Sequence, residues 1–354
     1  MLVSMNSKQA GRAGRHLSVA QPSYVLTIVV TYKSAMTFRH LLPALQEWLA
    51  SDTVNRLVVL DNSGDAQLVE YAAEELSNHA DRAISMVNKF NSGFALGVNT
   101  GYSLAVAKWG TPRVVVLLNP DVATSSATIA GVVSLLEVTG VGVAAPKLVT
   151  GKGVVERGSM RRRWNMRRLI ADTMGTPDAA ALMLTRRRNI EPQANAALID
   201  VDITSGAFMA IAGEVFGKGL DTRMPMYLED QEICHRARVN GYRVVVDQRL
   251  AAEHVGGASR KKNDDSQRWL RIAELALAPS ISMADWSGSE SILRGRLAVL
   301  IGGILRLTAA SCAFSASALR RGSRGWAVEQ IRLSLWLIQW ALRPSSIESD
   351  RGLT

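Results

Sequence analysis

Residues 114–122 read VVVLLNPDV, and the interpretation of the whole fold begins from this stretch. Five successive apolar residues, three of them β-branched, predict a fully buried strand. Pro120 cannot donate a hydrogen bond to a neighbouring strand, so the strand ends at Asn119 and leaves Asp121 at its carboxyl end. Ligands of open α/β sheets bind at that edge, where one carboxylate beside phosphate oxygens can hold Mg²⁺. An aspartate in a tight turn is the alternative, and this segment alone favours neither.

The composition describes a basic globular protein. In 354 residues, 41 Lys and Arg outweigh 31 Asp and Glu, and the net charge of +10 predicts an anionic partner. Aromatic residues make up only 6% and do not interleave with a basic stripe, which argues against nucleic acid. The two cysteines lie in no metal or redox spacing and favour a reducing compartment. Residues 1–22 lack the apolar run of a signal peptide, so we expect a disordered basic arm on a cytoplasmic protein.

Strand and helix patterns alternate through the first half of the chain. Apolar runs predict strands at residues 24–32, 56–61, 83–87, 114–118 and 141–149. Helices with short links are expected between most of these strands. This order is typical of a mainly parallel α/β sheet with helices on both faces.

Polar residues and glycines follow the predicted strand ends. Thr31 and Tyr32 end the first strand and Asp61 ends the second. Asp61 could accept from a base or ribose, or it could equally begin a turn or cap the next helix. Glycines recur every fourth residue from Gly93, which suits either close approach of a ligand or tight helix–sheet packing. The spacing is not Gly-x-Gly-x-x-Gly and no Walker lysine follows, which disfavours a dinucleotide or ATPase site.

A basic insertion occupies residues 157–190 and contains nine arginines. Arginine suits bidentate recognition of phosphate, although a solvated basic face is the simpler alternative. No strand pattern is evident there. We therefore interpret the insertion as a mobile loop that also contacts anions.

Three carboxylates, at positions 229, 230 and 232, begin a predicted helix that ends near Asn240. Acidic residues in a first helical turn suit the helix dipole, which explains one or two of them. The apolar residues just before Glu229 indicate that this end of the helix is buried, where a carboxylate can act as a general base. His254 stands beside glycines after a further strand, and a lone histidine is more often structural than a ligand.

The C-terminal residues 261–354 are predicted to be helical. Residues 297–305 are apolar, Arg306 interrupts them, and Trp326–Leu342 carries three tryptophans among Leu and Ile. A span across a bilayer needs about 20 apolar residues, and an interior arginine makes it costly. Tryptophan with flanking arginine favours helices lying on an anionic membrane surface. An ordinary helical hairpin packed on the domain is the alternative.

Taken in order, the motifs resemble those of inverting family 2 glycosyltransferases of GT-A fold. The stretch beginning at Asn91, the Asn119-Pro120-Asp121 turn, Ser205-Gly206-Ala207-Phe208 and Glu229-Asp230 carry the likeness. Within that family the chain is most similar to bacterial rhamnosyltransferases that use dTDP-rhamnose. The resemblance implies a GT-A domain at residues 23–260, with a donor half at 23–122 and an acceptor half at 123–260.

The resemblance also implies a role for each matching residue. Asp230 would be the general base, with Glu229 beside it. Asp121 would hold Mg²⁺ or Mn²⁺ on the diphosphate, and His254 could reach the metal or the diphosphate. Asn119 replaces the first Asp of the usual D-x-D motif. The nucleotide-sugar would be bound by Thr31, Tyr32, Asp61, Asn91, Gly93, Asn99 and Asn119.

The expected activity is transfer of rhamnose, with inversion, from dTDP-rhamnose to a cell-envelope glycan or a polyprenyl-diphosphate-linked saccharide. A UDP- or GDP-linked donor, a nucleotidyltransferase and a non-catalytic nucleotide-sugar-binding module are the alternatives. The basic insertion and the tail favour a lipid-linked acceptor and a peripheral position at the inner face of the cell membrane.

Overall fold

The computed structural model describes residues 24–156, 158–163, 166–174, 189–193, 196–217, 219–222, 229–255, 289–319 and 325–342. The predicted arm at 1–22 and much of the basic insertion lie outside the described residues. The described residues include every candidate site residue named above.

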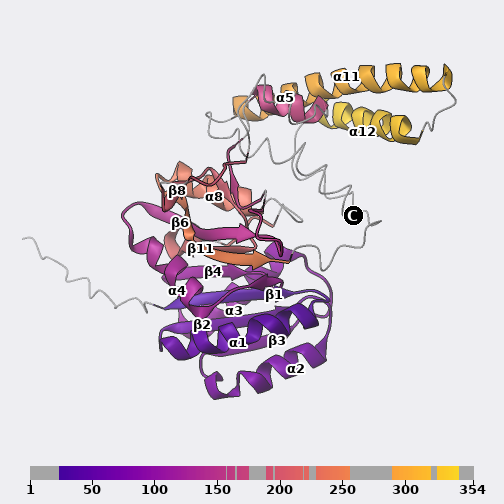
Figure 1. Cartoon of the computed structure of the whole chain (residues 1–354). Helices are drawn as coiled ribbons and strands as arrows, with labels where there is room; N and C mark the ends of the chain where they lie inside the picture. Colours follow the sequence, from indigo (N-terminus) through magenta and orange to yellow (C-terminus); the bar gives the residue numbers. More distant parts are fainter. Residues whose placement is uncertain are drawn as a thin grey trace, which may run out of the picture.

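The described residues form a nine-stranded mixed sheet (Figure 1). Its strands are β1 (Val25–Thr31), β2 (Asn55–Asp61), β3 (Ala83–Val87), β4 (Val114–Leu118), β5 (Val122–Ala123), β6 (Val141–Val149), β8 (Leu198–Asp200), β10 (Phe208–Ala212) and β11 (Arg243–His254). The order is β3-β2-β1-β4-β10-β6-β11-β5, and β8 pairs with β11. β1, β2, β3 and β4 run parallel, whereas β10 is antiparallel to both its neighbours. The prediction of a mixed, mainly parallel α/β sheet is confirmed.

Helices cover both faces of this sheet. They are α1 (Ala35–Ser51), α2 (Ala66–Glu75), α3 (Phe94–Trp109), α4 (Ser126–Ser134), α7 (Gly213–Phe216) and α8 (Glu229–Val239). The strands alternate between two cores: Val25 and Val29 of β1 pack with α1, α2 and α4, whereas Leu26 and Ile28 pack with α3, α7 and α8. Because side chains alternate along a strand, an unbroken apolar run serves both cores at once.

The path of the chain creates a switch point beside β1. From β1 the chain proceeds outward through β2 to β3 and then returns to β4, on the other side of β1. The register pairs Thr31 with Asp61 and Ile28 with Leu117, so the carboxyl ends of these strands meet at one edge. Ligands of open α/β sheets bind at such a switch point. Asp121 follows β4 at this edge.

Glycines of α3 permit the helix to lie close to the sheet. A Cβ at Gly101 would come within 3.2 Å of Ile28 Cγ2 and of Val58 Cγ1, and a Cβ at Gly97 would lie 3.1 Å from Val30 Cγ1. The sequence left open whether these glycines allow close approach of a ligand or tight helix–sheet packing. For Gly97 and Gly101 these distances favour tight packing. Gly93 differs, because its φ of 79° is a conformation that glycine adopts without strain.

Replacing Gly101 with valine should lower the free energy of unfolding by about 1–3 kcal/mol, because the added methyl groups overpack the α3–β1 contact. Urea unfolding followed by circular dichroism measures the effect. Ser103→Ala, on the exposed side of the same helix, serves as the control. Equal stability of the Gly101→Val and wild-type proteins would show that α3 has room to move outward.

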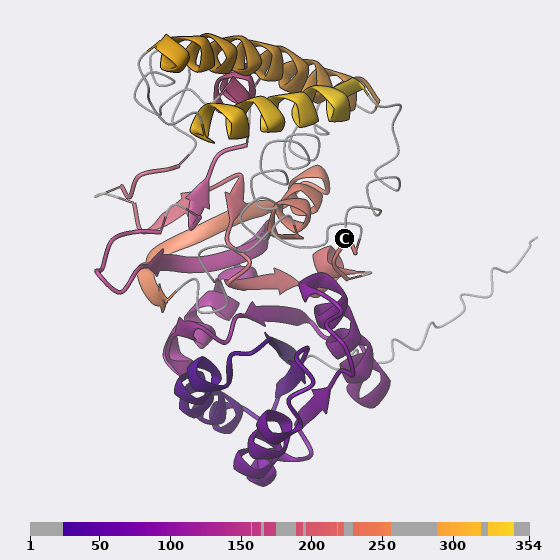
Figure 2. The same ribbon diagram turned by 90° about the vertical axis from the view of Figure 1, so that its right-hand side faces the viewer.

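Part of the basic insertion is a helix, so its interpretation as a mobile loop is wrong over α5 (Met166–Met174). α5 packs against α11 (Ser289–Leu319), and α11 packs against α12 (Gly325–Leu342) (Figures 1 and 2). The sequence pattern did not reveal this helix, because a charged residue, Arg168, is buried together with Leu169, Ala171 and Thr173. We call α5, α11 and α12 together the helical module.

Arg306 joins the three helices of the module. Its Nη1 donates to the carbonyl oxygen of Thr173 at 3.1 Å, and its Nε donates to Oε1 of Gln330 at 3.1 Å. The carbonyl belongs to the last turn of α5, where a cation also complements the helix dipole. The arginine that interrupts the apolar run of α11 is therefore paired inside the module. The prediction of a helical C-terminal segment is confirmed for the described residues.

Candidate active site

Asp61 organises the end of β2. Its buried Oδ1 accepts from Thr31 Oγ1 at 2.7 Å, while its Oδ2 accepts from the backbone N–H groups of Ser63 and Asp65 at 2.8 and 2.9 Å. A carboxylate that accepts several hydrogen bonds in this way fixes the turn that leads into α2. These bonds favour the turn-forming role of Asp61. A contact between Asp61 and a base stays a prediction.

The loop before α3 is tied to the same edge by Asn62. Nδ2 of Asn62 donates to the carbonyl of Gly93 at 2.9 Å, and Oδ1 accepts from Asn88 and Ser92 at 2.7 and 3.0 Å. Oδ1 of Asn91 accepts from the N–H of Gly93 at 3.0 Å, which forms the turn that opens the helix. Asn62 and Asn88 were not predicted as site residues. The signal that could have identified them is their position, because each directly follows the end of one of two neighbouring strands.

Three further residues that were predicted to bind the nucleotide-sugar, Tyr32, Asn119 and Asn99, differ in their surroundings. Tyr32 is 37% exposed at the end of β1, where a ring can stack on a base. Asn119 lies after β4, and its N–H donates to the carbonyl of Ala207 at 2.8 Å. Asn99 instead binds Leu220 with both ends of its amide, each at 2.8 Å. Its role in donor binding stays a prediction, and its hydrogen bonds favour a structural one.

Asp121 and His254 lie side by side at this edge. β5 pairs antiparallel with the end of β11, with Val122 opposite His254, and the N–H of Val255 donates to the carbonyl of Asp121 at 3.0 Å. Nε2 of His254 is 3.4 Å from Oδ1 of Asp121, and each side chain is 15% exposed. His254 is the last residue of a long strand rather than the start of a turn. This pairing of distant segments explains why the two residues meet.

Glu156 completes the arrangement and was not predicted. It lies just beyond the bridge between Val149 and Val155, where the chain folds back after β6, and its Oε2 is 2.9 Å from Nδ1 of His254. Burial lowers the pKa of His254, but the hydrogen bonds to Asp121 and Glu156 outweigh burial and raise this pKa to about 9. With this pKa the imidazole carries both ring protons at pH 7 and faces a carboxylate on each side, so Nε2 would become a ligand only when a cation displaces its proton, with Nδ1–H still held by Glu156.

The pair Asp121–His254 fits a divalent cation as two of its ligands. Mg²⁺ and similar ions commonly take one or two protein ligands and complete their shell with water and phosphate oxygens. In the part of the chain that the structure describes, no group of three or more His, Cys, Asp or Glu is arranged to hold a metal ion. These residues would therefore hold a cation together with the phosphates of a bound ligand.

Replacing Glu156 with glutamine should weaken Mn²⁺ affinity roughly 10–100-fold, because the partner that orients His254 loses its charge. A Mn²⁺ titration in the presence of a bound nucleotide-sugar measures the affinity. Glu253→Gln makes the same charge change at an exposed residue next to His254 and should leave the affinity within twofold. Equal affinities for the two variants would contradict the role of Glu156.

Asp230 lies in the first turn of α8, across a short segment from the turn that carries Asp121. A Cβ at Gly206 would lie 3.3 Å from Cβ of Asp230, and the next residue, Ala207, accepts from the N–H of Asn119. Residues 205–207 therefore contact both the turn that carries Asp121 and the helix that carries Asp230. Oδ2 of Asp230 forms an ion pair with Arg161 at 2.5 Å. Glu229 beside it is buried.

Cys234 lies one turn further along α8. Burial raises its pKa to about 12, so the side chain stays a neutral thiol at pH 7. A nucleophilic cysteine needs the thiolate. Asp230 is therefore the better candidate for acid–base chemistry on this helix.

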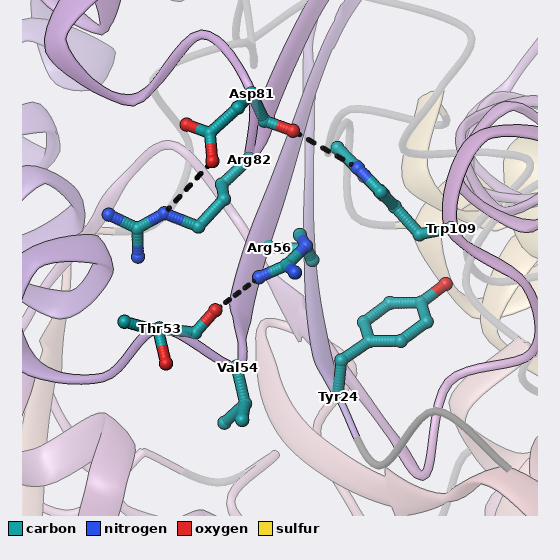
Figure 3. Close-up of a pocket in the computed structure, with 7 residues that line it drawn as sticks. All are labelled: Tyr24, Thr53, Val54, Arg56, Asp81, Arg82 and Trp109. Carbon is teal, nitrogen blue, oxygen red and sulfur yellow. Dashed lines mark hydrogen bonds and ion pairs between the residues drawn. The ribbon is translucent and has the colours of Figure 1, made fainter. Parts of the chain in front are cut away.

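A separate hollow of about 700 Å³ lies at the opposite edge, near the amino ends of β1, β2 and β3 (Figure 3). Its arginines have structural partners: Nη1 of Arg82 donates to the carbonyls of Leu49 and Asp52 after α1, and Arg56 lies beside the rings of Tyr24 and Trp109. These bonds satisfy helix-end carbonyls. This hollow is not part of the candidate site.

No protein-family model matches the chain. The low-salt glycan biosynthesis hexosyltransferase Agl10 of Haloferax volcanii is 24% identical over 213 residues, and the match spans 60% of this chain and 60% of that protein. The mannosyltransferase PcManGT from Pyrobaculum calidifontis, solved with GDP-Man and Mn²⁺, superposes with a TM-score of 0.52 at 20% identity. That superposition covers 91% of this chain and 88% of the other. The predicted glycosyltransferase-type α/β fold is confirmed.

Proposed function

We propose that this protein is a glycosyltransferase that moves a sugar from a nucleotide-sugar to an acceptor hydroxyl. One observation carries the proposal: residues 205–207 contact both the turn that carries Asp121, whose pair with His254 is suited to a divalent cation, and the helix that carries a separate carboxylate, Asp230. The sequence similarity to a hexosyltransferase and the fold similarity to a mannosyltransferase support it.

The residues fit the chemistry of direct displacement at the anomeric carbon. Asp230 accepts the proton of the attacking hydroxyl, which is general base catalysis. Asp121 and His254 would hold a divalent cation, which would neutralise charge on the departing nucleoside diphosphate. A base and a leaving group on opposite sides of the sugar give inversion. Glu229 is the neighbouring buried carboxylate in the first turn of the same helix.

Two other classes fit less well. A nucleotidyltransferase needs a glycine-rich, Lys- or Arg-containing loop after the first strand, and Tyr32-Lys33-Ser34 contains no glycine. A non-catalytic module that binds nucleotide-sugars would have no use for a base, so it predicts full function after Asp230→Asn.

dTDP-rhamnose is the donor that we propose, on the strength of the motifs around Asn119 and Glu229-Asp230. The structural neighbour was solved with GDP-Man, and the sequence left GDP- and UDP-linked sugars open as competing donors. Two proposals are tested by one binding panel, namely the donor assignment and the transferase activity itself. Thermal shift and calorimetry measure binding of dTDP-rhamnose, GDP-mannose and UDP-N-acetylglucosamine, each with Mn²⁺ or Mg²⁺. Preferential binding of dTDP-rhamnose supports the donor assignment. Preference for another sugar nucleotide overturns that assignment alone, and binding of none contradicts the proposed activity.

We also propose that the helical module lies on the cytoplasmic face of an anionic membrane and brings the site to a lipid-linked cell-envelope acceptor. Within the described residues, Arg294–Ser315 of α11 is long and apolar enough to cross a membrane by length and composition, with mean hydropathy 1.9. Four of its apolar side chains are exposed, namely Leu297, Ile301, Ile304 and Leu305. Exposed apolar residues on a basic protein favour surface binding.

Vesicle flotation tests this placement. The full chain should float with vesicles containing anionic phosphatidylglycerol, and Leu297→Glu with Ile304→Glu should lower the bound fraction several-fold, because each charge must enter the acyl boundary. Thr100→Glu, on the distant helix α3, is the matched control. Equal flotation of the variant and the wild type would contradict membrane contact through α11.

A further inference from the structure

We propose that Arg161 is a positioning residue for Asp230: it holds one carboxylate oxygen and leaves the other to the acceptor hydroxyl. This inference rests on the proposed function, because it assigns a device to the same base. The sequence offered no reason to separate Arg161 from the eight other arginines of the insertion. The structure provides that reason.

Arg161 differs from its neighbours in burial and in anchoring. It is 9% exposed, whereas Arg162 and Arg163 are exposed. β7 (Met160–Arg161) pairs antiparallel with β9 (Ile203–Thr204), and the carbonyl of Arg161 accepts from the N–H of Asp202 at 3.1 Å. The backbone of Arg161 is thus fixed to the segment that precedes Gly206. Its guanidinium therefore starts from a rigid position.

The guanidinium contacts Asp230 at one point. Nη2 lies 2.5 Å from Oδ2 of Asp230 and 3.4 Å from the carbonyl oxygen of Thr204. The side chains of Arg161 and Asp230 are 11% and 13% exposed, so water screens this pair weakly. Arginine keeps its proton in proteins, so its charge and its bond direction are constant. The contact fixes the orientation of the carboxylate.

The second oxygen of the carboxylate is unused. Among the described residues, Oδ1 of Asp230 and Nε of Arg161 are buried side-chain atoms without a hydrogen-bond partner. A bidentate arginine–carboxylate pair would use both oxygens of the carboxylate. A buried acceptor without a partner is unfavourable for folding, which is typical of sites that receive a ligand. We assign Oδ1 as the atom that accepts the proton of the acceptor hydroxyl.

Kinetics of three variants test the assignment, with the donor that the binding panel identifies. Arg161→Met should lower kcat roughly 10–100-fold, because a misplaced base loses its alignment with the hydroxyl. Its donor affinity should stay within twofold of wild type. Arg161→Lys keeps the charge and should recover part of the rate. Arg162→Met, the matched control one residue away, should turn over like wild type.

A double-mutant cycle separates positioning from general structural support. If Arg161 acts through Asp230, Arg161→Met should cause no further loss in an Asp230→Asn background. An equal loss in both backgrounds would overturn the inference, as would Arg161→Met turning over as fast as Arg162→Met. If Arg161→Met unfolds, Arg161→Lys takes its place in the cycle with the same criteria. An active wild type with these results overturns the inference alone, whereas an inactive wild type overturns the proposed function with it.

Discussion

Asp230→Asn should lower the rate of sugar transfer by roughly 10²–10⁴, because asparagine keeps the shape of the side chain but cannot accept a proton. Asp230 is the carboxylate that adjoins Gly206 and is held by Arg161. Initial rates of nucleoside diphosphate release, measured with acceptor present, report the effect. Donor affinity should change little, since the base acts on the acceptor side.

Glu232→Gln is the matched control for this experiment. It makes the same charge change on the same helix, but the Glu232 carboxylate is paired with Arg236 at 2.5 Å. The side chains of Glu232 and Arg236 are 16% and 25% exposed, and a glutamine can still accept from Arg236, so the transfer rate of Glu232→Gln should stay within about threefold of wild type. Circular dichroism of both variants confirms that α8 is intact. A fully active Asp230→Asn protein would show that Asp230 is not the general base.

Asp121→Asn should lower transfer at least 10²-fold at limiting metal, the second large effect expected. The amide is a weaker ligand for a hard cation than the carboxylate, and charge neutralisation at a leaving diphosphate contributes several kcal/mol. The dependence of rate on Mn²⁺ concentration should also move to higher concentrations. Both quantities come from one titration of the rate with Mn²⁺.

The control for Asp121 is Asp65→Asn. Asp65 caps α2, accepting from the N–H of Leu68 at 3.1 Å, and it lies on the turn that Asp61 organises. Its replacement should leave the Mn²⁺ dependence unchanged. If the rates of Asp121→Asn and wild type depended on Mn²⁺ concentration in the same way, Asp121 would not be a metal ligand.

Several strands could be predicted from the sequence because their signal is local. The bounds of β3, β4 and β6 agree with the predicted strands at 83–87, 114–118 and 141–149. β4 and β6 are the apolar runs that a strand buried on both faces requires, whereas β3 lies at the edge of the sheet and is half-buried. The open choice at Gly101 needed the structure, because only the positions of Ile28 and Val58 show what a side chain would meet.

The composition of the site depends on contacts between distant segments, which a single sequence does not reveal. Asp121 and His254 meet because a two-residue strand, β5, pairs with the end of β11. Glu156 reaches His254 from a turn after β6, and Arg161 reaches Asp230 across 69 positions. Asp121, His254 and Asp230 each match a motif of the family that the sequence resembles, so they were predicted as individual site residues. Glu156 and Arg161 carried none.

The most direct test of the account is a turnover measurement with the wild-type protein. The sugar nucleotide that binds is incubated with Mn²⁺ and a polyprenyl-diphosphate-linked saccharide, and release of the nucleoside diphosphate is followed beside Asp230→Asn. We expect donor consumption with a glycosylated product for the wild type, and donor binding without consumption for the variant. Absence of turnover by the wild type with every donor and acceptor supplied would contradict the proposed transferase activity.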